Sequence, residues 1–125
     1  MTVLIDSNVW IEYFAGSERG KKAIPFIEGN EKIVISTINL AEVYRHILSK
    51  KNKQEAEKAK EGMLQYSFCI PVSTEIAIAA AITKHEKKIG LADSIILAIA
   101  QQENALLVTD DNDFRGQKNI QFVNF

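Results

Sequence analysis

Short apolar runs alternate along this chain with longer stretches in which apolar residues recur at helical spacing. A strand that is buried on both faces is apolar throughout, so such runs are typical of a parallel sheet covered by helices on both sides. We therefore predict a protein of the α/β class, although the pattern leaves the strand order open. The expected strands are Val3–Ile5, Ile33–Ile35, Phe68–Ile70, Leu106–Val108 and Ile120–Val123.

Helix signals lie between the expected strands. Ser36 can cap a helix whose apolar stripe consists of Leu40, Val43, Tyr44, Ile47 and Leu48. Other helices are expected at residues 7–14, at 18–28 (which Pro25 should kink or shorten), at 74–87 and from Asp93 onward. Residues 50–60 (KKNKQEAEKAK) alternate in charge without an apolar stripe, which favours a solvated helical hairpin over an RNA-contacting patch.

Length and composition suit a single domain over residues 1–125. The 15 Lys and Arg residues nearly balance the 16 Asp and Glu residues, and the formal net charge of -1 makes nucleic acid a less expected partner without excluding it. Cys69 is the single cysteine, which excludes an internal disulfide and a CxxC motif. The sequence shows neither a secretory signal nor a membrane-spanning run, so the protein is expected to be soluble and cytoplasmic.

Acidic residues stand at or near the ends of several expected strands. Asp6 follows the first strand and Asp111 follows the fourth, while Glu42 lies early in the helix after the second strand. Asp93 opens the central apolar helix. Ligands of open parallel sheets bind at the carboxyl ends of the strands, so these four carboxylates could converge at one edge.

Each of these acidic residues also has a local alternative role. Asp6 and Asp93 could cap helices or complement the helix dipole, and Glu42 could form a capping box with Asn39. Asp110, Asp111 and Asp113 lie in a turn-rich stretch where Asp is common. A structural role therefore competes with a functional one at every single position.

Clustering would distinguish the two roles, because neighbouring carboxylates repel one another unless a cation offsets their charge. Oxygen ligands without cysteine or histidine favour Mg²⁺ or Mn²⁺, and neither His46 nor His85 has the spacing of a zinc ligand. Such a cluster supports metal-assisted phosphoryl transfer with a phosphodiester as substrate.

Four stretches of the chain, in this order, resemble the PIN domain and, within it, the VapC-type ribonuclease toxins. They are IDSNVWIEYF, TINLAEVYRHIL, GLADSIILAIA and VTDDNDF, and the resemblance extends from Val3 to Phe125. It implies a three-layer α/β/α sandwich with a central, mainly parallel sheet, and a divalent-metal endoribonuclease whose product carries a 5′-phosphate. The residues that match the family's catalytic and metal-binding acids are Asp6, Glu42, Asp93 and Asp111, with Asp6 and Asp93 as the most direct ligands.

The resemblance also implies supporting residues and partners. Asn8 and Thr109 match polar positions that would orient a water or a carboxylate, and Asp113 could be an outer ligand, whereas Asp110 falls at a variable position. Arg45 and His46 share the helix face of Glu42 and are candidate RNA contacts, with a solvated face as the alternative. The implied partners are the RNA substrate, a cognate antitoxin and a second copy of the chain, with no membrane.

Other interpretations stay open. A non-catalytic PIN-like protein could bind or scaffold RNA, although all four acidic positions are filled here. A phosphatase of the haloacid-dehalogenase type also places Asp after its first strand but usually has a second Asp two residues later, where this chain has Asn8. A receiver-type signalling domain would need a phosphoacceptor Asp after the third strand, and Ile70-Pro71-Val72 supplies none.

Overall fold

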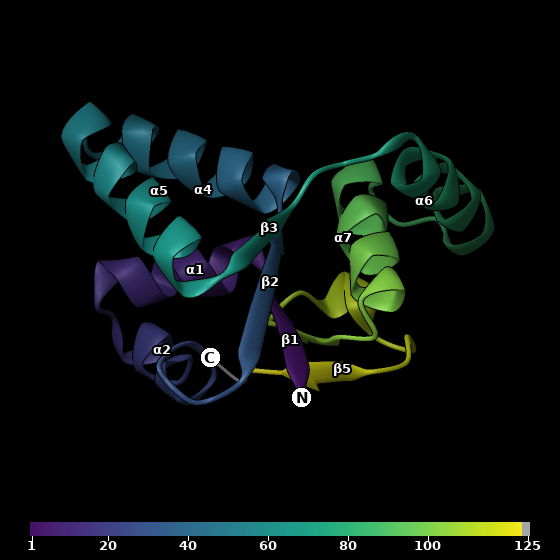
Figure 1. Ribbon diagram of the computed structural model, residues 1–125, viewed down its shortest axis with the longest axis horizontal. Coiled ribbons are helices and arrows are strands. Elements are labelled where there is room, and N and C mark those ends of the chain that lie inside the picture. Colours follow the sequence, from purple (N-terminus) through teal and green to yellow (C-terminus); the bar gives the residue numbers. More distant parts are fainter. Residues whose placement is uncertain (124–125) are drawn as a thin grey trace.

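Five parallel strands form the central sheet of a computed structural model that describes residues 1–123 (Figure 1). Asn124 and Phe125, the last residues of the predicted domain, lie outside the described residues. The strands are β1 Thr2–Ile5, β2 Lys32–Ser36, β3 Phe68–Ile70, β4 Leu106–Thr109 and β5 Ile120–Phe122. All five predicted strands are therefore present, and the predicted parallel α/β class is confirmed.

The strand order changes direction beside β1. The sheet reads β3-β2-β1-β4-β5, so the chain builds one half outward from β1 and then returns to add the other half on its far side. Leu4 of β1 pairs with Val34 of β2 on one side and with Leu107 of β4 on the other. Open α/β sheets bind ligands at such a switch point, outside the carboxyl ends of the strands.

Helices cover both faces of the sheet, which confirms the α/β/α sandwich (Figure 1). They are α1 Ser7–Ala15, α2 Glu18–Lys21, α3 Ile24–Ile27, α4 Thr37–Lys50, α5 Lys53–Tyr66, α6 Thr74–Lys87, α7 Leu91–Gln102 and the 3₁₀ helix η1 Asn112–Phe114. Val3 and Ile5 of β1 join the core under α1, α4 and α5, whereas Leu4 joins the core under α6 and α7. This division follows from the alternation of side chains along a strand.

Helix α7 is central, as its almost entirely apolar sequence predicts. Every residue from Ser94 to Ala100 is buried. The helix begins at Leu91 with Gly90 as its N-cap, so Asp93 lies in the first turn and does not serve as the cap. Within residues 1–123, no helix combines the length and the apolar character needed to cross a membrane.

The helix predicted over residues 18–28, which Pro25 was expected to kink or shorten, is present as two short helices, α2 and α3. Pro25 lacks the N–H that would donate to the carbonyl of Lys21, so a single helix cannot run through this position. Gly20 brings α2 close to α1, since a Cβ there would lie 2.0 Å from the backbone oxygen of Glu12. This close approach holds the short helix against its neighbour.

The charged segment after α4 buries more of its length than its composition indicates. It forms the second arm of a helical pair, but Ala56, Ala59 and Met63 of α5 are buried in the core that α4 also covers. Small residues let two helices approach closely, and they are easily missed in a search for large apolar residues. Leu48, by contrast, was expected on the buried stripe of α4 and is 45% exposed.

Ser36 fixes the start of α4, and its substitution gives a first prediction. Its hydroxyl accepts a hydrogen bond from the N–H of Ile38 at 3.0 Å. Ser36→Ala should lower the free energy of unfolding by about 1 kcal/mol, because one N–H of the first turn loses its partner. Urea unfolding measures this loss, and an unchanged midpoint would contradict the capping role.

Candidate metal centre

The predicted acidic residues gather at the switch point of the sheet. Asp6 directly follows β1, and its N–H donates to the carbonyl of Val108 in β4 at 2.9 Å. Asp111 follows β4, Glu42 lies in α4 after β2, and Asp93 lies in the first turn of α7. Segments far apart in the sequence therefore supply carboxylates to one edge of the sheet.

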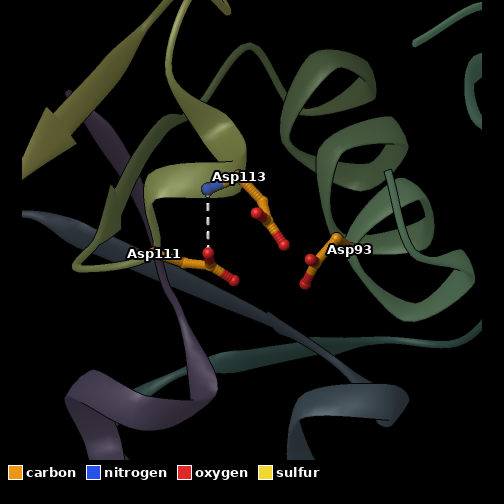
Figure 2. A group of neighbouring side chains, drawn as sticks. All are labelled: Asp93, Asp111 and Asp113. Atoms are coloured by element: carbon orange, nitrogen blue, oxygen red, sulfur yellow. Dashed lines mark hydrogen bonds between the residues drawn. The ribbon is translucent and has the colours of Figure 1, made fainter. Parts of the chain in front are cut away.

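Asp93, Asp111 and Asp113 form a tight group of carboxylates (Figure 2). One oxygen from each lies within 4.8 Å of the others. Figure 2 shows Asp93 of α7 pointing toward the two acids of the η1 segment. The N–H of Asp113 donates to Oδ1 of Asp111 at 2.9 Å, so the backbone fixes this carboxylate. Asp113, expected as an outer residue, thus stands inside the group.

Asp6 is held from two directions. It is only 6% exposed, and its Oδ1 accepts a hydrogen bond from the N–H of Ser7 at 2.8 Å. Its Oδ2 accepts a hydrogen bond from the hydroxyl of Thr109 at 2.7 Å, and the same hydroxyl oxygen accepts from the N–H of Asp111 at 3.0 Å. Thr109 therefore connects two of the acids. Asp6 also caps α1, so capping and a place in the site coexist.

The environment of Asp6 changes its acidity. Burial raises the pKa of Asp6 from 3.8 to about 6. The hydrogen bonds from Thr109 and Ser7 favour the ionised form and oppose this rise, while the charges of Glu42 and Asp111 add to it.

Asp93 is affected more strongly. Burial raises the pKa of Asp93 to about 7, and repulsion from four other carboxylates adds to the rise. In decreasing order of effect, these are Asp111, Asp6, Asp113 and Glu42. The charges of four acids thus act on Asp93. Glu18, Glu31, Glu55 and Glu57, which lie outside this group, form ion pairs.

Glu42 is connected to α1 through Ser7. The hydroxyl of Ser7 donates to Oε1 of Glu42 at 2.7 Å and accepts a hydrogen bond from the side chain of Asn39 at 2.9 Å. The predicted capping box between Asn39 and Glu42 is wrong, because Asn39 pairs with the N-cap Ser36. Asn39 is at N3 of α4, and Glu42 is too far along the helix to reach the cap.

The hydrogen-bonding roles of Ser7 and Asn39 at the site were not predicted from the sequence. Their signals were present, since Ser7 directly follows Asp6 at a strand end and Asn39 lies three residues after a helix cap. The sequence does not indicate which side chain either residue binds. Only the three-dimensional arrangement brings Ser7 to Glu42 and Asn39 to Ser7.

Other predicted residues point elsewhere. Asn8 donates to Oδ2 of Asp110 at 2.6 Å, so it orients a carboxylate that the sequence analysis placed outside the site. Arg45 is exposed on α4. His46 lines a cavity of about 240 Å³ together with Ile11 and Phe14, and the lining of this cavity includes none of the five acids.

The donor atoms suit a hard divalent cation. Asp93, Asp111 and Asp113 offer carboxylate oxygens only, which are ligands that Mg²⁺ and Mn²⁺ prefer. A bound cation would also offset the repulsion that, in addition to burial, raises the pKa of Asp93. The arrangement can therefore hold a divalent cation and, beside it, a phosphate-containing ligand.

Comparisons with known proteins agree with this architecture. A family model described as PIN domain matches residues 3–119. A toxin–antitoxin complex from Klebsiella pneumoniae is similar with a TM-score of 0.79 and 28% identity, covering 95% of each chain. VapBC2 from Rickettsia felis, bound to a DNA fragment from its promoter, has a TM-score of 0.80 and 22% identity over 99% of this chain and 100% of that chain.

A third similar structure is VapC20 from Mycobacterium tuberculosis, described as a sarcin–ricin loop cleaving toxin. Its TM-score is 0.69 at 14% identity, over 83% of this chain and 85% of that chain. Among curated protein sequences, none matches significantly.

Proposed function

The chain belongs to the PIN-domain family, and from this premise we propose that it is a Mg²⁺- or Mn²⁺-dependent endoribonuclease, the toxin of a toxin–antitoxin pair. One observation carries the proposal, which is the convergence of mutually repelling carboxylates at the switch point of the sheet. The proposed catalytic and metal-binding residues are Asp6, Glu42, Asp93 and Asp111, with Asp113 beside them.

The metal would be held by Asp93 and Asp111 together with Asp6 and Glu42, and Asp113 stands close enough to contribute an oxygen. When bound, Mg²⁺ or Mn²⁺ supplies positive charge to the phosphodiester and makes a water molecule easier to deprotonate. Without a cation, Asp93 is about half protonated at neutral pH, because its pKa is about 7. Proton and cation therefore compete for the same carboxylate.

The chain itself keeps the acids in place. Hydrogen bonds to both oxygens of Asp6, from Ser7 and Thr109, restrict rotation of this carboxylate. Each oxygen retains a further lone pair for a ligand. A hydrogen bond from the N–H of Asp113 likewise restricts rotation of the Asp111 carboxylate. Such a preorganised site reacts with little rearrangement.

RNA is the proposed substrate, and exposed Arg45 with its neighbour His46 are proposed contacts to the RNA backbone. A cognate antitoxin is the proposed protein partner, because the Klebsiella pneumoniae relative, at 28% identity, is recorded as a toxin–antitoxin complex. We further propose that the protein acts in the cytoplasm and pairs with a second copy of itself.

Incubation of the purified protein with total RNA tests the enzymatic proposal. Cleavage should require Mg²⁺ or Mn²⁺ and stop with a chelator. RNA binding without cleavage under any cation would favour the scaffold alternative. Hydrolysis of a small phosphomonoester, with RNA left intact, would favour the phosphatase alternative.

Expression in a bacterial host tests the toxin role. The wild-type chain should arrest growth, and Asp6→Asn should relieve the arrest because it removes one carboxylate of the site. Asparagine is also a good N-cap, so α1 should keep its start. Glu75→Gln, which removes an exposed charge from the first turn of α6, is the matched control and should still arrest growth. Arrest by Asp6→Asn at equal protein level would contradict the proposal.

A further inference from the structure

A line of hydrogen bonds runs from the start of α4 to the acidic group. The backbone N–H of Ser36 donates to Oδ1 of Asn39 at 2.8 Å. The side-chain N–H of Asn39 donates to the Ser7 oxygen, and the Ser7 hydroxyl donates to Glu42. Asn39 is fully buried and Ser7 is 7% exposed, so these bonds are shielded from competing water up to the last one.

The buried end of this line sets its direction. The N–H of Ser36 needs an acceptor, so the amide of Asn39 must present its oxygen to Ser36 and its NH₂ group to Ser7. A flipped amide would leave two buried donors facing each other, which is costly. The Ser7 oxygen therefore accepts from Asn39, and its one hydrogen is free to bind Glu42.

Ser7 also joins two acids of the site. Its backbone N–H binds Asp6 and its hydroxyl binds Glu42, so one residue sets the spacing between a carboxylate at the end of β1 and a carboxylate on α4. Glu42 needs such a partner, because it is exposed and has a long, flexible side chain. Asp6, by contrast, is buried.

We propose that Ser7 is a positioning residue that holds the carboxylate of Glu42 at the acidic group, and that Asn39 orients Ser7 for this role. The inference rests on the proposed function, since it assumes that Glu42 helps to hold a divalent cation. It extends that function to two neutral residues that do not touch the cation themselves.

Mn²⁺ affinity, measured by isothermal titration calorimetry without RNA, tests this role in a two-residue cycle. Ser7→Ala should weaken Mn²⁺ binding about tenfold, as the loss of a hydrogen bond to a metal ligand commonly does. In a Glu42→Ala background the same substitution should change the affinity little, because the carboxylate that Ser7 positions is gone. Ser7→Thr keeps the hydroxyl and should retain most of the affinity.

Two further variants separate positioning from folding. Ser73→Ala removes a hydroxyl that caps α6 and should lower the melting temperature without changing Mn²⁺ affinity. Asn39→Ala keeps Ser7 but frees its hydroxyl, so it should give a smaller loss of affinity that also vanishes without Glu42. This variant provides a second test if Ser7→Ala does not fold.

The outcomes distinguish the inference from the function on which it rests. Equal losses of Mn²⁺ affinity from Ser7→Ala with and without Glu42 would overturn the positioning role. If Glu42→Ala weakens Mn²⁺ binding and Ser7→Ala does not, the positioning role alone fails. If Glu42→Ala leaves the affinity unchanged, the proposed metal-binding role of Glu42 fails as well.

Discussion

Asp93→Asn is expected to slow RNA cleavage by about a thousandfold or more while the fold is retained. Asp93 supplies one of three carboxylates whose oxygens lie within 4.8 Å of one another. Asparagine has nearly the same shape but lacks the charge that would hold and orient the cation. Losing ~4 kcal/mol of transition-state stabilisation corresponds to about three orders of magnitude in rate. Single-turnover cleavage of an end-labelled RNA with saturating Mn²⁺ measures the effect.

Glu75→Gln is the matched control for this experiment. Glu75 lies in the first turn of α6, as Asp93 lies in the first turn of α7, so both substitutions remove a charge near a helix start. The control should cleave RNA at the wild-type rate. If Asp93→Asn and the wild type cleave equally, the activity comes from a contaminating nuclease and the proposed role of Asp93 is contradicted.

The strands could be predicted because strands of a parallel sheet that helices cover on both faces are short apolar runs. Val3–Ile5 and Leu106–Val108 are apolar throughout, and in the structure all of these residues are buried between two helical layers except Leu106, which is partly buried. Their pairing could not be predicted. Nothing within the apolar runs themselves indicates that β4 lies beside β1. The strand order depends on how the connection from β3 to β4, which contains α6 and α7, crosses the sheet.

The candidate site was predictable only in part, for a related reason. Asp6 and Asp111 could be found because Asp6 directly follows β1 and Asp111 comes two residues after the end of β4. The contacts that hold the acids join side chains far apart in the sequence, since Ser7 and Glu42 are separated by 35 positions and Asn8 and Asp110 by 102. Such contacts depend on rotamers and on strand order, neither of which a local pattern contains.

The acidic group should make the cation-free protein less stable as pH rises. In the folded state the pKa of Asp6 is about 6 and that of Asp93 about 7, both above the ordinary value of 3.8. Well below pH 4 both carboxyls are protonated whether the chain is folded or unfolded. Between about pH 4 and pH 7 the unfolded chain loses these protons first, so the folded state binds more protons and the free energy of unfolding falls as pH increases.

With a chelator present, we expect the free energy of unfolding to be about 2 kcal/mol lower at pH 8 than at pH 5. A shift of one pKa unit corresponds to ~1.4 kcal/mol, and the expected difference is smaller than the shifts alone would give because solvent screens part of the interaction. Urea unfolding measures this difference. Asp93→Asn should remove most of it, whereas Glu75→Gln should keep it. Mn²⁺ at about a hundred times its Kd should stabilise the wild type at pH 8 by about 2.7 kcal/mol, and Asp93→Asn far less. Equal stability of the wild type at both pH values would contradict the raised pKa values of Asp6 and Asp93, which burial and the charges of neighbouring acids produce.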